Sequence, residues 1–222
     1  MKIIKSITDR NCDHKKRVFV HHNRLGDLWL TMCKLVLDKT DVVVQCTKEC
    51  RERVEYCNRM FGNRFNVEVV PDNHESYDEQ IGSARGFIRR IKNKLPKPKT
   101  FWSEEQRIKG KVCYSKQAVT KNRSKKVDNI DHLEVMLSQY FCQIVCVDYP
   151  MSLDDATEHL SDCDLFITNE SGLSHIANSM RVPTVVLVGA KNERITRRWQ
   201  PNKHMICNTL SQLEEYLKNY GS

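Results

Sequence analysis

The segment from Asn169 to His175 (Asn-Glu-Ser-Gly-Leu-Ser-His) combines the groups that proteins use to bind phosphate. It follows the apolar run 165–168 and precedes a predicted helix. In a parallel sheet, such a turn places the free N–H groups of a helix at the carboxyl end of a strand. Gly172 permits close backbone approach, Ser171 and Ser174 supply hydroxyls, and the terminal histidine adds an N–H donor. The alternative is an ordinary helix cap, for which either serine is suited.

A basic block runs from Arg85 to Lys126, where the only acidic residues are Glu104 and Glu105. The whole chain has 36 Lys and Arg against 28 Asp and Glu, a formal net charge of +8. Such a balance attracts anionic partners, although a block of this kind can also be a solvated linker. If the partner is a nucleic acid, the candidate contacts are Arg89, Arg90, Lys92, Lys94, Lys97, Lys99 and Trp102.

Metal binding and disulfides are not expected. The chain has 10 cysteines, but no Cys-x-x-Cys pair with histidines at zinc-finger spacing. A disulfide framework is typical of short secreted chains, so we interpret these cysteines as reduced and mostly buried. Asp162-Cys163-Asp164 imitates an Asp-x-Asp metal motif, but it lies between a predicted helix and strand, and we interpret it as structural. No cofactor is expected.

The elements that position the first candidate residues alternate between strand and helix. We predict strands at 17–20, 41–45 and 66–70, with helices at 28–37 and 48–61 between them. The turn at 22–27 therefore follows the first strand. This alternation predicts a parallel sheet with right-handed crossovers.

The pattern weakens from 72 to 110 and then restarts. Predicted strands at 111–114, 143–147, 164–168 and 184–188 alternate with helices at 130–141, 153–160 and 174–180. The expected α/β fold has two domains, 1–105 and 106–208, and an amphipathic helix at 209–220 that packs back on the first domain. The sequence shows no long apolar run and no secretory signal, so we expect a cytoplasmic protein.

Residues 168–190 resemble the donor-site signature of the heptosyltransferases, glycosyltransferase family 9: an acidic residue, Ser or Thr, Gly, two variable residues, His, a short helix, Pro-Thr and a strand ending in Gly. Glu170 stands where the family usually has aspartate. The resemblance implies a nucleotide-diphosphate-sugar donor held by Asn169, Glu170, Ser171, Gly172, Leu173, Ser174 and His175.

The turn after the first strand resembles the same family's Arg-Leu-Gly-Asp loop. The resemblance implies a glycosyltransferase-B fold, with two Rossmann-like domains and the active site in the cleft between them. It makes Asp27 the general base, with Asn23, Arg24 and Gly26 beside it on the acceptor side. Lys121 matches the family's phosphate-binding lysine in approximate spacing, and Lys116 competes for that role. The alternative for the aspartate is an N-cap on a helix beginning at Leu28.

The chain is shorter than typical family members, so we expect a reduced N-terminal domain, trimmed within 72–110. Among acceptors we favour a hydroxymethylated base in double-stranded DNA, as in compact phage-encoded transferases. The bacterial or host cytoplasm would then be its location. Transfer to lipopolysaccharide core or another glycan is the first alternative. An inactive nucleotide-sugar or nucleic-acid binding module and a nucleotide-sugar epimerase are the others.

Overall fold

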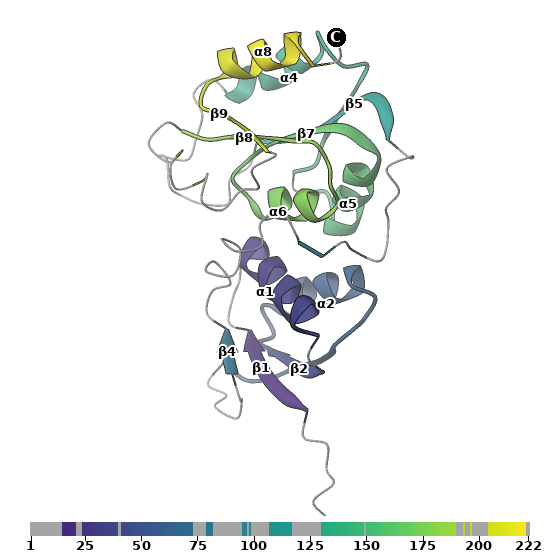
Figure 1. The fold of residues 1–222 in the computed structure, drawn as a ribbon, viewed down its shortest axis with the longest axis vertical. Coiled ribbons are helices and arrows are strands. Elements are labelled where there is room, and N and C mark those ends of the chain that lie inside the picture. The colour runs from purple at the N-terminus through teal and green to yellow at the C-terminus, as the bar shows by residue number, and fades with distance from the viewer. Residues whose placement is uncertain are drawn as a thin grey trace, which may run out of the picture.

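A computed structural model describes residues 15–20, 24–39, 41–72, 95–96, 98, 107–116, 130–148, 150–189, 193, 196 and 204–220, and the backbone of 79–81. The chain is an α/β protein with two parallel sheets (Figure 1). No helix among these residues is long and apolar enough to cross a membrane.

The first sheet has the order β3-β2-β1-β4, and its strands pair in parallel. Its elements are β1 (Lys16–Val20), α1 (Leu25–Asp38), β2 (Val42–Cys46), α2 (Arg51–Met60), β3 (Asn66–Val69) and β4 (Glu79–Ile81). The predicted alternation of strand and helix is confirmed here: β1 and β2 carry buried apolar residues, whereas β3 pairs at the edge of the sheet and is largely exposed. The short β4 lies in the segment where the pattern weakened and was not predicted.

The second sheet has the order β6-β5-β7-β8-β9, again with parallel pairing. Its elements are β5 (Ile108–Ser115), the 3-10 turn η3 (Ile130–His132), α4 (Leu133–Leu137), β6 (Gln143–Cys146), α5 (Leu153–Asp162), β7 (Cys163–Asn169), α6 (Gly172–Ser179), β8 (Thr184–Leu187), β9 (Met205–Cys207) and α8 (Leu210–Lys218). The expected domain boundary at 105 and 106 lies outside the described residues.

The single long helix predicted for 130–141 is wrong. The structure has a 3-10 turn and then only the short α4, which ends at Leu137. The hydroxyl of Ser138 donates to the carbonyl of Val135 at 2.8 Å, and the following amides make tighter turns. Serine competes in this way for backbone groups that would otherwise extend a helix.

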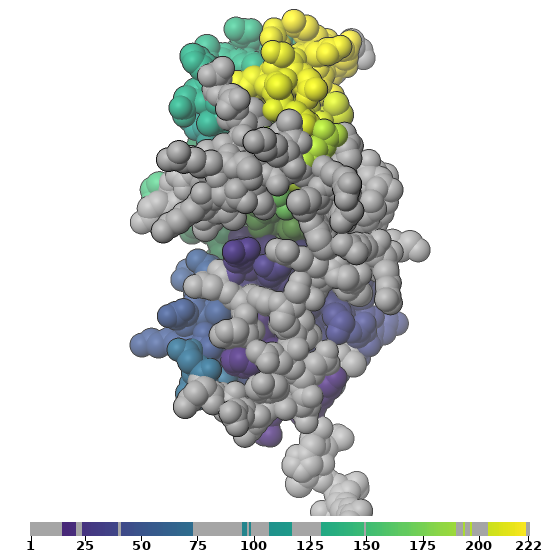
Figure 2. All heavy atoms as spheres, turned by 90° about the vertical axis from the view of Figure 1, so that its left-hand side faces the viewer, coloured from purple at the N-terminus to yellow at the C-terminus, as the bar shows by residue number. Residues whose placement is uncertain are grey.

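The expectation that the C-terminal helix packs on the first domain is also wrong. Leu213 and Leu217 of α8 are buried in a cluster with Val112 and Leu133 of the second half. Both views show the C-terminal segment beside α4, at the end of the molecule far from the first sheet (Figures 1 and 2). The reason is the short connection from β9, which leaves α8 directly beside its own sheet.

The two halves share one apolar core. Helices α1 and α2 of the first half face α5 and α6 of the second (Figure 1). The larger cluster joins Val18 and Trp29 of the first half to Leu160, Phe166 and Ile176 of the second, all fully buried. Burial of apolar surface is the main stabilising term in folding, so this cluster fixes the halves against each other.

Candidate functional site

The turns after β1 and β7 meet in space. Helix α1 begins at Leu25 and α6 at Gly172, each just beyond the carboxyl end of a strand. A Cβ atom added to Gly172 would lie only 2.8 Å from the backbone nitrogen of Gly26 and 2.9 Å from Cβ of Leu25. Only a residue without a side chain fits between these backbones. The structure thus brings the two sequence motifs together at one point.

The N-terminus of α6 has no side-chain cap. Ser171 occupies the N-cap position in an extended conformation, but its hydroxyl lies 3.2 Å from that of Thr168 and makes no cap hydrogen bond. Ser174 lies inside the first turn, where its hydroxyl donates to the carbonyl of Ser171 at 2.7 Å. Ser171 therefore takes the N-cap position without capping the helix through its hydroxyl, Ser174 is not the cap, and a helix start at 174 is wrong. The first N–H groups of a helix with no side-chain cap are those that bind anions.

Asp27 is not a helix cap either. Because α1 begins at Leu25 rather than Leu28, Asp27 lies in the first turn and the exposed Arg24 occupies the N-cap position. Asp27 is half-buried. An acidic side chain in a first turn is favoured by the helix dipole. The contact between Gly26 and Gly172 places this turn of α1 against the first turn of α6.

His175 lies between the two helices. It is 9% exposed, and a Cβ added to Gly26 would come within 3.2 Å of its ring carbon Cδ2. Burial, and after it the nearby His175, lowers the pKa of His204 to about 3. His204 is therefore a neutral neighbour of the donor-loop histidine. Glu170 accepts a hydrogen bond from the hydroxyl of Thr196 at 3.2 Å.

Three strand ends of the second sheet are tied together at its carboxyl edge. Asp148 accepts from the hydroxyl of Ser115 at 2.6 Å and from the backbone N–H of Lys116 at 2.8 Å. The carbonyl of Lys116 accepts from the side-chain amide of Asn169 at 2.6 Å. Lys116 places its ammonium 5.8 Å from the ring centre of Tyr114. The candidate lysine is therefore held by its backbone, beside the first residue of the phosphate loop.

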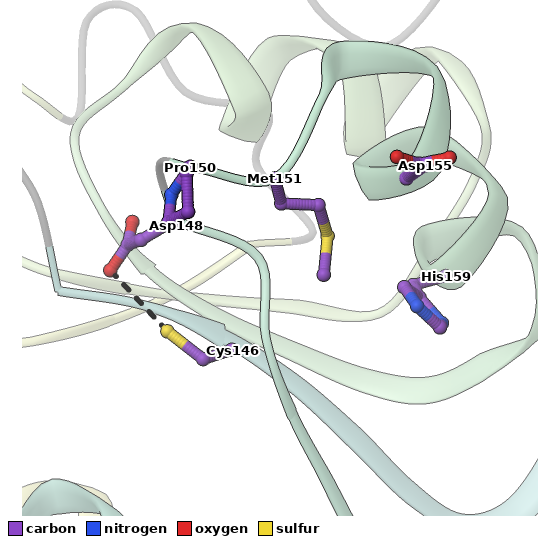
Figure 3. A pocket seen from close by; sticks show the side chains of 6 residues that line it. All are labelled: Cys146, Asp148, Pro150, Met151, Asp155 and His159. Carbon is purple, nitrogen blue, oxygen red and sulfur yellow. Dashed lines mark hydrogen bonds between the residues drawn. The ribbon is translucent and has the colours of Figure 1, made fainter.

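A pocket of about 530 Å³ opens beside this network (Figure 3). The side chain of Met151 lies between Asp148 on the loop after β6 and His159 on α5, as the close-up shows. The lining residues are Cys146, Asp148, Pro150, Met151, Asp155 and His159. Sequence reasoning did not assign the pocket, although its loop directly follows a predicted strand, where ligands collect in parallel sheets.

Some predicted residues cannot be placed. Those outside the described residues are Asn23, Lys121, Arg89, Arg90, Lys92, Lys94, Lys97, Lys99 and Trp102. In the Asp162-Cys163-Asp164 motif, Asp162 pairs with the buried Lys111, and Asp164 accepts from the backbone N–H of Gly110 at 3.1 Å. Its structural interpretation is confirmed. Among the described residues, no three His, Cys, Asp or Glu side chains gather as metal ligands.

Comparison with solved structures identifies the fold. The protein matches the structure of E. coli ADP-heptose lipopolysaccharide heptosyltransferase II with a TM-score of 0.55 and 13% identity. The match covers 92% of this chain and 98% of the heptosyltransferase chain. E. coli heptosyltransferase WaaC with ADP matches with a TM-score of 0.52 and 12% identity over 92% of this chain and 96% of that chain. At this identity the likeness shows the glycosyltransferase-B fold alone.

A third match is TibC, an iron-containing dodecameric glycosyltransferase from enterotoxigenic E. coli H10407. Its TM-score is 0.54 and its identity 14%, over 79% of this chain and 59% of that one. The chain thus spans about three-fifths of the length of TibC. No curated protein matches the sequence. Residues 117–219 match the profile described as glycosyltransferase family 9 (heptosyltransferase). With its two parallel sheets, the chain therefore has the glycosyltransferase-B fold of these heptosyltransferases, and residues 117–219 are similar to glycosyltransferase family 9.

Proposed function

We propose that this chain transfers a sugar from a nucleotide-diphosphate sugar to an acceptor hydroxyl, with inversion and without a metal ion. The observation that carries the proposal is the contact between Gly26 and Gly172, which joins the turn bearing Asp27 to the N-terminus of α6. A general base and an anion site close to each other are what this reaction requires.

The diphosphate would lie at the N-terminus of α6. Its developing negative charge would face the first N–H groups of the helix and the helix dipole. Lys116, held at the same sheet edge by Asp148 and Asn169, supplies a cation within the described residues. Lys121 stays a prediction for the same role. Fixed donors and cations of this kind stabilise a leaving diphosphate as its charge grows.

The nucleoside would occupy the pocket beside Asp148 and Met151. The hydrogen bonds through Asn169, Lys116 and Asp148 form a continuous path along the sheet edge from the phosphate loop to this pocket. A donor with a phosphate end and a flat nucleoside end therefore matches the arrangement of the edge. We propose that Asp148 orients the loop around the nucleoside, since both of its oxygens accept from Ser115 and Lys116.

Asp27 would act as the general base. As the acceptor oxygen attacks the anomeric carbon, its hydroxyl proton passes to the carboxylate of Asp27. The bond between the anomeric carbon and the diphosphate oxygen breaks, and the diphosphate leaves with the electron pair. A single displacement from the opposite face inverts the anomeric configuration.

The charge of the chain and its likeness to heptosyltransferases both bear on the identity of the acceptor. A net charge of +8 favours a polyanion. The likeness to heptosyltransferases favours lipopolysaccharide core or another phosphorylated glycan, and we place this acceptor first. Hydroxymethylated double-stranded DNA, favoured from the sequence, is supported by charge alone. The cytoplasmic location stays a prediction.

The test is to incubate the protein with a panel of nucleotide sugars, including ADP-heptose and UDP-glucose, and to measure nucleoside diphosphate release. Each donor is paired with lipopolysaccharide core or with hydroxymethylcytosine DNA. Release that depends on the glycan supports the proposal as ordered here, and release that depends on DNA reverses the order of acceptors. Binding without turnover for every pair would replace the enzyme with a nucleotide-sugar binding module.

A further inference from the structure

Two buried hydrogen bonds connect α1 of the first half to the backbone of the donor loop. The indole N–H of Trp29 donates to the hydroxyl of Ser179 at 2.9 Å. That hydroxyl donates to the carbonyl of His175 at 3.3 Å. Trp29 and Ser179 are both 0% exposed. This hydrogen-bonded route from the first half thus ends on His175, the last residue of the candidate phosphate-binding segment 169–175.

The polar character of this contact is informative because the surroundings are apolar. Trp29 lies within the shared core and its ring centre is 4.9 Å from that of Phe61. A phenylalanine would also bury its ring there, but it would not select a hydrogen-bond partner. A buried indole N–H needs an acceptor, so it favours the one register of α6 against α1 that offers the hydroxyl of Ser179.

The same face of α1 also contacts the ring of His175. Gly26 is three residues before Trp29, so the two positions are neighbours on the helix surface. A Cβ on Gly26 would lie 3.2 Å from Cδ2 of His175. The α1 face therefore touches His175 at its ring and reaches its carbonyl through Ser179. Between these two contacts lies the turn that carries Asp27.

We propose that Trp29 is a positioning residue of the donor site: through Ser179 its N–H sets the register of α6, and with it the placement of His175 and the phosphate loop against Asp27. This inference rests on the proposed function. It assigns no chemistry to Trp29, which reaches the donor only through α6. It predicts that losing one N–H group weakens donor binding without removing any group that touches the donor.

The experiment uses Trp29→Phe, Ser179→Ala and the double variant in the full chain. Two readouts are taken: the NMR signals of the His175 ring in histidine-labelled protein, and the Kd for ADP and UDP as probes. Each single variant should move the His175 signals and weaken binding of the preferred diphosphate by about tenfold. Because both act on one route, the double variant should be little weaker than either single variant.

The control is Tyr56→Phe. Tyr56 and Thr157 form another buried hydroxyl contact between the halves, but that contact ends on α5 rather than α6. Tyr56→Phe should lower stability and leave the His175 signals and the Kd as in the wild type. A merely structural role for Trp29 would make Trp29→Phe behave like this control, and that result would overturn the proposal.

Two further outcomes are decisive. If Trp29→Phe does not fold, Ser179→Ala removes the same route with the loss of one oxygen atom and decides alone. If the wild type binds no nucleoside diphosphate, the proposed function fails. The His175 signals of Ser179→Ala then still show whether the contact positions the loop: moved signals support it, and unmoved signals overturn it.

Discussion

At the residue scale, the proposed transfer depends on Asp27 as a general base rather than as a helix cap. Asp27→Asn keeps the size and polarity of the side chain but cannot take up the proton. We expect the transfer rate to fall by about 10²- to 10⁴-fold, with the donor Kd unchanged. Single-turnover kinetics with the donor identified by the panel would measure the rate, and calorimetry would measure the Kd.

Asp38→Asn is the matched control, since Asp38 is the last residue of the same helix and pairs with Lys34 on the surface. Its transfer rate should equal that of the wild type. An undiminished rate in Asp27→Asn would remove Asp27 from the role of base.

His204 gives the protein a pH-dependent stability. Its pKa falls from 6.5 to about 3 on folding, because of burial and then of His175, so the unfolded chain binds more protons between these values. The free energy of unfolding therefore has its full value above pH 6.5 and declines as the pH falls towards 3. By linkage, this residue alone removes about 1.4 kcal/mol between pH 8 and pH 5.5.

Urea unfolding of wild type and His204→Gln at both pH values measures this contribution. The variant is expected to be less sensitive to acid by about that amount. Equal sensitivity of the two proteins would show that His204 does not remain neutral in the fold.

At the element scale, the contact between α1 and α6 predicts that Gly172→Ala lowers the stability of the protein, whereas helix propensity predicts that it raises it. Alanine is better than glycine inside a helix by about 1 kcal/mol, so propensity alone predicts that Gly172→Ala stabilises the protein. The new Cβ would instead lie 2.8 Å from a backbone nitrogen of the other half. Backbone atoms cannot move out of the way as the end of a flexible side chain can. Overpacking of this kind lowers the free energy of unfolding by about 1–3 kcal/mol. We expect net destabilisation in urea unfolding, and a more stable variant would show that the helices are not in contact.

The same contact explains what sequence reasoning found and missed. The apolar runs predicted most strands and helices correctly. The starts of α1 and α6 were placed too late because Gly26 and Gly172 look like loop residues in sequence. The close approach of the two helices explains why both positions are glycine, and no local pattern reveals that contact. The pocket was missed although its lining residues all lie between Cys146 and His159, because the spacing of residues does not show that a surface is concave.

At the scale of the whole molecule, the shared core predicts that the two halves unfold together. One cluster contains strands and helices of both sheets, and Trp29 reports on its centre. Urea unfolding followed by tryptophan fluorescence and by far-UV circular dichroism should therefore give coincident transitions. Two separate transitions would mean that each sheet folds on its own core and that the contact of α1 with α6 is weak.

The central claim is that the turns after β1 and β7 form one donor site. It is tested most directly by titrating ¹⁵N-labelled protein with ADP and UDP and following the backbone amide signals. The account predicts that the signals of Gly26 and of Gly172 to His175 shift together with a single Kd, and that signals of α8, at the far end of the second half, stay in place. If neither diphosphate shifts the signals of both turns, the claim is contradicted.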